Sequence, residues 1–262
     1  MKAALVTGAA RGIGAATATK LAEQGWAVLA VDIAENAPAL PYPMGTGEEL
    51  STVVDKIRET GGIAEEFRAD VRDRAQLAAA VAEAEQRWGG LDAAIAAAGV
   101  IAGGVPLWEM PPEQEEAVLD VNLRGVLNLA HIAIPALLRR PKPRSGRFLA
   151  VASAAATRGL PMLAAYCAAK AGVAGLIRAL GTELGDSGVT ANAVSPGSTD
   201  TPILAESARL YDLPSAQSFA AQQPVQRLLD PAEIAAVLAF LASPESSATT
   251  GAVIPADGGL AL

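Results

Sequence analysis

A tyrosine and a lysine four residues apart are the residues of this sequence best suited to chemistry. Tyr166 and Lys170 lie in a run of helical composition, A-A-Y-C-A-A-K-A-G-V-A-G-L-I-R-A-L, so their side chains share one helix face. A nearby ammonium favours the phenolate, and we expect it to lower the pKa of Tyr166 from about 10 toward neutrality. A tyrosine tuned in this way can pass a proton to or from an alcohol oxygen.

A serine at the end of a predicted strand adds a third polar group. Ser153 follows the apolar run at residues 148–152, which has the composition of a buried parallel strand. Its hydroxyl would then lie at the strand's carboxyl end, where open α/β sheets bind ligands. A Tyr-x-x-x-Lys pair alone is a weak signal, because the same pair is also found on solvated helix faces. The surrounding elements must decide between the two interpretations.

Length, charge and cysteine content limit the class of protein. A chain of 262 residues suits one α/β domain, and a net charge of -8 argues against nucleic acid or an anionic membrane as partner. The single cysteine, Cys167, excludes an intrachain disulfide, fits a reducing cytosol and is interpreted as a small buried packing residue. A strand pattern from residue 3 leaves no room for a signal peptide, and residues 93–108 are too short for a membrane span. We expect a soluble, cytoplasmic protein.

The first strand pattern, at residues 3–7, runs into a glycine-rich turn, T-G-A-A-R-G-I-G, and then a helix pattern. Glycines let the backbone approach a pyrophosphate, which then lies at the positive end of the helix. A glycine cluster alone suits an ordinary tight turn equally well. A second strand, at residues 26–31, ends at Asp32, which is 18 residues after Gly14. This is close to the spacing expected for an acid that binds the adenosine ribose hydroxyls.

The acid also bears on the choice of dinucleotide. A carboxylate at Asp32 repels a 2′-phosphate by roughly 1 to 4 kcal/mol at about 4 Å, depending on the effective dielectric. The sequence therefore favours NAD over NADP. Arg11, inside the glycine turn, is the opposing observation, because it could receive a 2′-phosphate.

Residues 34–46, A-E-N-A-P-A-L-P-Y-P-M-G-T, form a proline-rich insert that cannot be regular helix or central strand. One interpretation is a surface loop, and the other is a flap over the adenosine end of the cofactor. We favour the flap, since three prolines with Leu40, Tyr42 and Met44 make a stiff apolar loop directly after Asp32. Thr46 and Glu49 then predict a capping box that begins the next helix.

The remaining elements alternate between strand and helix. Asn122 lies inside a long predicted helix, where an asparagine is usually solvated or bonded to a nearby carbonyl, and His131 is interpreted as structural. Residues 203–225 have no clean period, which suits a mobile substrate lid, and Asp230 with Glu233 predicts another helix start. The predicted strands are residues 3–7, 26–31, 63–68, 91–97, 148–152, 189–194 and 251–256.

These motifs, in this order, resemble the short-chain dehydrogenase/reductase family over essentially the whole chain. The resemblance rests on T-G-x-x-x-G-I-G, Asp70-Val71, Asn122, Ser153, Tyr166-x-x-x-Lys170, Pro196-Gly197 and a late D-G-G. It implies one Rossmann-type α/β domain over residues 1–262, with a doubly wound, seven-stranded parallel sheet, usually tetrameric. Residues 1–100 would mainly bind the dinucleotide, and residues 101–262 would form the catalytic and substrate half.

The resemblance also implies roles for single residues. Tyr166 would be the general acid/base, Ser153 would polarise the substrate oxygen, and Asn122 would anchor a proton-relay water. Lys170 would lower the pKa of Tyr166 and bind the nicotinamide ribose. Ala97 departs from the family, because A-A-A-G replaces the usual N-N-A-G and leaves only backbone atoms there. No metal is expected.

The predicted cofactor contacts combine the glycine turn, Asp32 and the family match. Asp70 and Val71 would flank the adenine, and Thr199 and Thr201 would lie beside the carboxamide and phosphates. The full set is Gly8, Arg11, Gly12, Ile13, Gly14, Asp32, Ile33, Asp70, Val71, Ala97, Ala98, Gly99, Tyr166, Lys170, Pro196, Gly197, Thr199 and Thr201.

The insert, together with A-A-A-G-V-I-A-G-G, resembles the subgroup associated with mycofactocin. That resemblance implies a nicotinoprotein, which holds NAD(H) too tightly to exchange it and passes electrons to an external redox carrier. The expected activity is NAD-dependent interconversion of a secondary alcohol and a ketone, with a small hydrophobic substrate such as a terpenoid or steroid. The alternative is a noncatalytic dinucleotide sensor on the same fold. Candidates for an apolar substrate pocket are Leu107, Trp108, Met110, Leu160, Met162, Leu163 and Tyr211.

Overall fold

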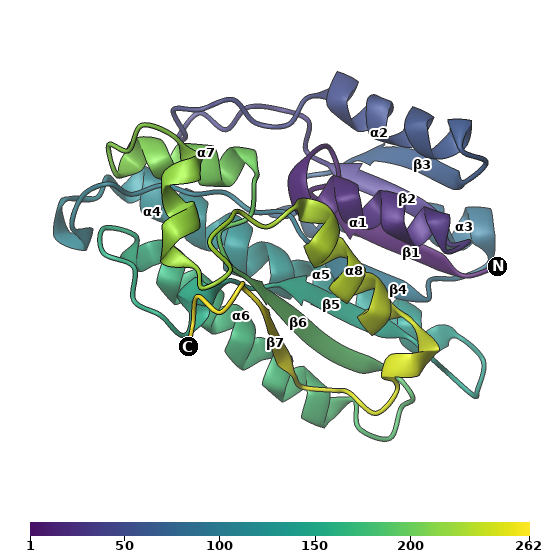
Figure 1. The fold of residues 1–262 in the computed structure, drawn as a ribbon. Coiled ribbons are helices and arrows are strands. Elements are labelled where there is room, and N and C mark those ends of the chain that lie inside the picture. Colours follow the sequence, from purple (N-terminus) through teal and green to yellow (C-terminus); the bar gives the residue numbers. More distant parts are fainter.

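Seven parallel strands form one sheet at the centre of the molecule. The computed structural model describes all 262 residues, and the strand order is β3-β2-β1-β4-β5-β6-β7 (Figure 1). The order reverses between β1 and β4, which opens a crevice at the carboxyl ends of the strands. The strands are β1 (Ala3–Thr7), β2 (Ala27–Asp32), β3 (Ile63–Arg68), β4 (Ala93–Ala96), β5 (Arg147–Val151), β6 (Thr190–Pro196) and β7 (Val253–Ala256). The predicted Rossmann-type fold is confirmed.

Helices cover both faces of this sheet, so most strand residues are buried on either side. On one face, Leu5 and Leu29 join a large apolar core with α3 and α6; on the other, Val6 and Val28 join a second core with α1 and α8. Helices of the first face are α3 (Arg74–Trp88), α4 (Pro112–Leu119), α5 (Gly125–Arg139) and α6 (Ala164–Glu183). Helices of the second face are α1 (Gly12–Glu23), α2 (Gly47–Glu59) and α8 (Pro231–Ala242).

The predicted capping box at Thr46 and the predicted helix start at Asp230 are both confirmed. The Thr46 hydroxyl accepts from the Glu49 amide, and the Glu49 carboxylate accepts from the Thr46 amide. Asp230 and Glu233 repeat the arrangement at the start of α8. Each cap satisfies amides that the first helical turn leaves free, which typically stabilises a protein by about 1 kcal/mol.

The helix that carries Asn122 is interrupted where an unbroken helix was predicted. A π turn over Asp120–Arg124 separates α4 from α5, and the Asn122 amide donates to the Val118 carbonyl at 2.9 Å. A side chain that competes for a backbone carbonyl favours this local widening. The whole run, Pro112–Arg139, is long and apolar enough to cross a membrane by length and composition. Here it packs against α3 and α6 as a core helix of the fold.

The segment at residues 203–225 has more regular structure than expected. Helix α7 (Pro202–Leu210) begins at Thr201, whose hydroxyl accepts from the Leu204 amide, and a 3-10 turn follows at Ala216–Gln222. The ring of Tyr211 meets that of Phe219 edge-on, 6.1 Å between centroids. The threonine cap and the proline at the first helical position favour a helix start here. The helix itself is too short for its apolar residues to show a clear helical period.

Candidate active site

One cavity of about 620 Å³ lies at the carboxyl ends of the strands. It is bordered by the loops that follow β1, β2, β4, β5 and β6, and by the first turns of α6 and α7. Every predicted catalytic residue and every predicted cofactor contact lines this cavity. Side chains from both halves of the chain therefore meet in one space.

Two helix N-termini converge on the glycine-rich turn. Gly8 has a φ of +69°, and a Cβ there would lie 2.6 Å from the Cα of Ala98. A Cβ on Gly14 would collide with the Gly8 carbonyl oxygen, so the tight turn into α1 requires glycine at both positions. Next to this turn, a Cβ on Gly12 would lie 3.3 Å from Thr201, the cap of α7. The first turn of α1 and the cap of α7 thus lie beside the glycine-rich turn, and a pyrophosphate fits this cradle.

Thr7 was missed as a site residue by the sequence analysis. Its hydroxyl oxygen accepts from the amides of Ala97 at 3.2 Å and Ala98 at 3.3 Å. The loop after β4 is therefore held to β1 even though Ala97 has no polar side chain. Its position directly before the glycine-rich turn is the sequence feature that could have identified Thr7 as a site residue.

Asp32, at the end of β2, organises the loops on its side of the cavity. Its carboxylate accepts from the amides of Ala10 at 3.0 Å and Ala34 at 3.1 Å. The Arg11 guanidinium instead donates to the Pro43 carbonyl at 2.8 Å, so it is engaged by the insert. Asp70 and Arg72 also line the cavity, and their side chains form an ion pair with each other.

Residues 34–46, here called the strap, run from the end of β2 to the loop that follows β4. In Figure 1 this segment extends from β2 toward α7. The Tyr42 hydroxyl accepts from the Ile101 amide at 2.9 Å, and Leu40 is buried in an apolar cluster with Val100 and Val118. Burial raises the pKa of Tyr42 to about 12, so its phenol is neutral. The strap is thus anchored on the far side of the cavity.

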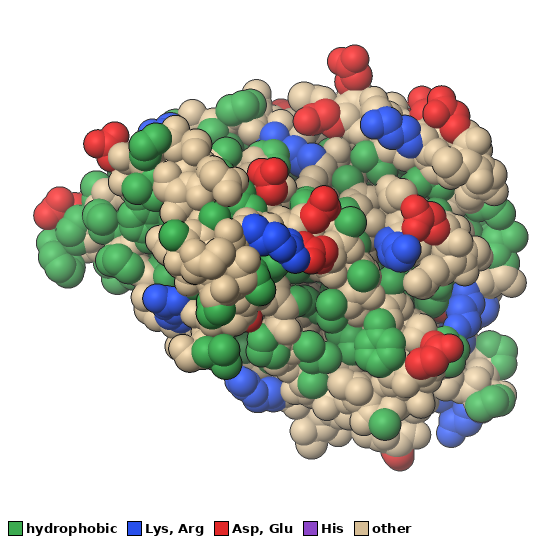
Figure 2. Space-filling model, in the orientation of Figure 1, with side chains coloured by type: hydrophobic (Ala, Val, Ile, Leu, Met, Phe, Trp, Pro, Cys, Tyr) green, Lys and Arg blue, Asp and Glu red, His purple; other side chains and the backbone are tan.

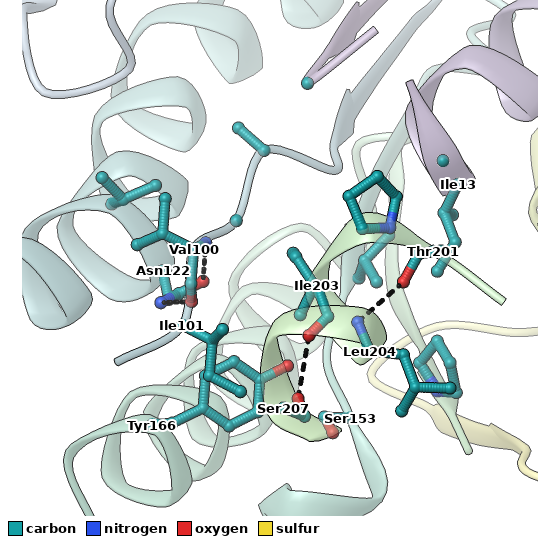
Figure 3. Close-up of a pocket in the computed structure, with 18 of the residues that line it drawn as sticks. Ile13, Val100, Ile101, Asn122, Ser153, Tyr166, Thr201, Ile203, Leu204 and Ser207 are labelled. Atoms are coloured by element: carbon teal, nitrogen blue, oxygen red, sulfur yellow. Dashed lines mark hydrogen bonds between the residues drawn. The ribbon is translucent and has the colours of Figure 1, made fainter. Parts of the chain in front are cut away.

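Figure 3 shows Tyr166, in the first turn of α6, beside Ser153, and Lys170 follows one turn later on the same helix. Lys170 is buried, and its ammonium donates to the Val151 carbonyl at 2.8 Å and lies 5.7 Å from the centre of the Tyr166 ring. The Ser153 oxygen accepts from the Ala155 amide at 3.1 Å, which orients the hydroxyl toward the cavity. The arrangement can hold and move a proton at the Tyr166 oxygen.

The predicted shift in the pKa of Tyr166 has the wrong direction for this state of the protein. Burial raises the pKa of Tyr166 to about 12, while the Ser153 hydroxyl lowers it as a hydrogen-bonding neighbour. Burial also lowers the pKa of Lys170 to about 8. Removing both groups from water penalises their charged forms more than their mutual attraction favours them. Tyr166 is therefore protonated at neutral pH and suited to give a proton.

Asn122 is fully buried and connects two parts of the wall. Its amide nitrogen donates to the Val100 carbonyl at 2.8 Å as well as to Val118, and its oxygen accepts from the Val100 amide at 3.1 Å (Figure 3). A Cβ on Gly99 would lie 3.0 Å from that oxygen. Asn122 therefore fixes the loop after β4 in the cavity wall, and its predicted relay water stays a prediction.

The substrate end of the cavity is apolar, but only part of the predicted set lines it. Leu160, Leu163 and Tyr211 do, together with the unpredicted Ile101, Ile203, Leu213 and Phe219. The prediction is wrong for the other four residues. Met110 is buried in the apolar cluster that also holds Leu40 of the strap. Met162, Leu107 and Trp108 are exposed to solvent. Figure 2 shows hydrophobic side chains on this projecting end.

Cys167 and His131 complete the comparison with the sequence predictions. Cys167 is half-buried, not buried, and its sulfur accepts from the Leu160 amide at 3.4 Å. His131 is exposed on α5, away from the cavity. No group of three or more His, Cys, Asp or Glu side chains is placed to hold a metal ion.

Comparison with known proteins places this geometry among oxidoreductases. A family model described as Enoyl-(Acyl carrier protein) reductase matches residues 8–261. The chain is 38% identical over 260 residues to cis-4-hydroxycyclohexanecarboxylate dehydrogenase of Sinomonas cyclohexanicum, covering 98% of this chain and 96% of the relative. It is 34% identical over 270 residues to (-)-trans-carveol dehydrogenase of Rhodococcus erythropolis, covering 99% and 97%. The crystal structure of carveol dehydrogenase from Mycobacterium avium in complex with NAD superposes with a TM-score of 0.92 at 33% identity, over 99% and 97% of the chains.

Proposed function

The chain belongs to the short-chain dehydrogenase/reductase family, and we propose that Ser153, Tyr166, Lys170 and Asn122 are its catalytic set. The protein is an NAD-dependent oxidoreductase that acts on CH–OH groups. The observation that carries the catalytic assignment is the meeting of Ser153, Tyr166 and Lys170 in one cavity with the glycine turn. NAD, when bound, accepts or returns the hydride of the carbinol carbon.

The chain's own residues handle the proton and the substrate oxygen. Tyr166 gives its proton to the carbonyl oxygen during reduction and takes it back during oxidation. The Ser153 hydroxyl donates to the same oxygen and holds it beside the phenol. Lys170 supplies a buried cation under the Tyr166 ring, and Asn122 holds the loop that closes the site. An anchoring role of Asn122 for a relay water belongs to this proposal.

The dinucleotide contacts follow from the cradle described above. The pyrophosphate lies at Gly8, Gly12 and Gly14, and the adenosine ribose hydroxyls meet Asp32. The Asp32 carboxylate repels a 2′-phosphate at this position, and the Pro43 carbonyl holds one donor of the neighbouring Arg11. We assign dinucleotide binding mainly to residues 1–100, and catalysis and substrate binding mainly to residues 101–262.

We further propose that the strap makes the protein a nicotinoprotein. A bound dinucleotide between Asp32 and the catalytic residues would lie beneath a segment anchored by Tyr42 at Ile101. Release then requires the strap to open, which breaks this hydrogen bond and exposes Leu40. An external redox carrier, as in the mycofactocin-associated subgroup, would reoxidise the cofactor in place.

The substrate, assembly and location complete the proposal. A small secondary alcohol or ketone suits the apolar end of the cavity, as alcohol substrates do for the two dehydrogenases named above. A homotetramer is the usual assembly of the family, and a single unpaired cysteine suits the cytoplasm. A noncatalytic dinucleotide sensor is the competing function, but a sensor has no use for a tyrosine and a lysine placed in this way.

The decisive experiment measures bound nucleotide in the purified, desalted protein by absorbance and mass spectrometry after acid release. Near-stoichiometric NAD(H), with alcohol oxidation supported by an artificial electron acceptor and not by added NAD, is the expected result. An empty protein that reduces free NAD would remove the nicotinoprotein proposal and leave an exchanging dehydrogenase. A protein that binds NAD and oxidises no alcohol under either condition would favour the sensor.

A further inference from the structure

One charged side chain remains without a partner at the substrate end of the cavity. Among the residues that line the cavity, the charged ones are Arg11, Asp32, Glu35, Asp70, Arg72, Arg158 and Lys170. The first five belong to the adenosine end, and Lys170 is buried under Tyr166. Arg158 alone stands among the apolar residues of the substrate end, next to Gly159 and Leu160.

Arg158 is positioned by its surroundings and yet has no acid to neutralise it. Its backbone amide donates to the Ala154 carbonyl at 2.9 Å, and its guanidinium donates once, to the Leu260 carbonyl at 2.6 Å. Eleven ion pairs occur in the structure, and none includes Arg158. A guanidinium has five N–H donors in a planar fork, so the remaining donors are free for an incoming carboxylate.

The position of Arg158 relative to Ser153 limits the shape of such a ligand. One 3-10 turn, Ala154–Ala156, separates the two residues, and it advances about 2 Å per residue. An anion at the guanidinium is therefore several bonds from the carbinol carbon at Ser153. Leu160, Leu213 and Phe219 line the same cavity and give it an apolar surface. We propose, resting on the proposed function, that the substrate is a hydroxy acid whose carboxylate binds Arg158 while its apolar body packs on these side chains.

This proposal differs from a purely hydrophobic alcohol in what it requires of the enzyme. A neutral alcohol leaves Arg158 unused, while the carboxylate gains charge-assisted hydrogen bonds to its guanidinium. The alternative role for Arg158 is to tether the C-terminal segment through Leu260. The two roles are separable because only the first depends on the charge of the substrate.

The test compares three probes: 4-hydroxycyclohexanecarboxylate, its neutral amide and cyclohexanol, with the holoprotein and an artificial acceptor. Wild type should show kcat/KM about 10- to 100-fold higher for the acid than for the amide. Arg158→Gln should remove that preference through KM and change cyclohexanol turnover little, and Arg158→Lys should restore part of it. Arg178→Gln is the matched control, since Arg178 is also exposed and unpaired but lies outside the cavity.

Two further measurements separate the possible failures. Calorimetric titration with cyclohexanecarboxylate reports anion binding without turnover, so Arg158-dependent binding in a protein that oxidises no alcohol would sustain this inference and remove the proposed function. Deleting residues 260–262 removes the tether acceptor and keeps Arg158. If the deletion abolishes the preference for the acid as fully as Arg158→Gln, or if wild type treats acid and amide alike, the carboxylate role is wrong.

Discussion

Burial and hydrogen bonding act in opposite directions on the phenol of Tyr166. Its pKa of about 12 keeps the proton on the oxygen at neutral pH, while the Ser153 hydroxyl favours the phenolate. Replacing Tyr166 with phenylalanine removes the proton donor and leaves the ring and its packing. We expect Tyr166→Phe to lower kcat by about 10²- to 10⁴-fold, as for loss of a general acid/base. Bound NAD should stay at the wild-type level, measured after acid release; unchanged turnover would exclude Tyr166 from the chemistry.

Lys170 links the same site to the pH dependence of stability. Its pKa is about 8 in the folded protein and 10.5 in the unfolded chain, so between these values the unfolded chain binds more protons. Below pH 8, burial of the charged ammonium lowers the free energy of unfolding by its full amount. As the pH rises from 8 to 10.5, the free energy of unfolding recovers by about 3 kcal/mol. Above pH 10, Tyr166 acts in the opposite direction because its folded pKa is raised.

We therefore expect the free energy of unfolding of wild type, relative to Lys170→Met, to increase from pH 8 to pH 10.5. Urea denaturation at several pH values measures the difference. The exposed Lys142→Met serves as control and should run parallel to wild type. A difference that stays constant over this pH range would mean that Lys170 is not buried as a charged group.

Individual site residues were predictable where spacing fixes geometry. Tyr166, Lys170 and Ser153 meet because a helix and a strand end have set periods, and the glycines meet because the turn admits nothing larger. The pKa of Tyr166 was not predictable, because it depends on how much water the surrounding chain removes. Arg158 escaped notice for a related reason, since only the folded structure shows that it has no acidic partner.

At the level of elements, the strap shows how a local pattern can predict a segment but not its contacts. Three prolines identified a stiff loop after Asp32, and Thr46 marked its end. That Tyr42 bonds to Ile101, 59 residues later, depends on β1 and β4 being neighbours in the sheet. Such long-range pairing has no signal in local sequence.

Tyr42→Phe tests the anchor of the strap. The change leaves the ring in place and removes the only oxygen that accepts from the buried Ile101 amide. An unpartnered buried amide costs about 1 to 3 kcal/mol, so the closed strap should weaken and NAD release should accelerate about 5- to 100-fold. Retention of NAD through repeated desalting, followed by absorbance, measures the rate. Tyr211→Phe is the control, because the Tyr211 hydroxyl donates to the Pro161 carbonyl, outside the strap. Equal rates of NAD release from the two variants would show that the Tyr42 anchor is unimportant.

Residues from the beginning and the end of the chain share one sheet and one apolar core. The core on one face combines Leu21 of α1 with Leu238 of α8, so the last helix of the chain covers the first. The sheet is likewise continuous from β3 to β7. Residues 1–100 would therefore lack part of their apolar core if they were separated from the rest of the chain. The packing of α8 on α1 could not be predicted from the order of the elements in the sequence.

Leu238→Ala, in α8, tests whether the beginning and the end of the chain unfold together. Leu238 is fully buried, and its truncation should lower the free energy of unfolding by about 2 to 5 kcal/mol, while Phe240→Ala on the exposed side of α8 should cost far less. Fluorescence of Trp26, in a background where Trp88 and Trp108 are phenylalanine, reports the dinucleotide half, and far-UV circular dichroism reports the whole chain. Both signals should shift together in Leu238→Ala, since Trp26 and Leu238 belong to the same apolar cluster. If the Trp26 transition stays at its wild-type midpoint while the circular dichroism shifts, residues 1–100 fold as an independent unit and NAD binding would survive loss of the catalytic half.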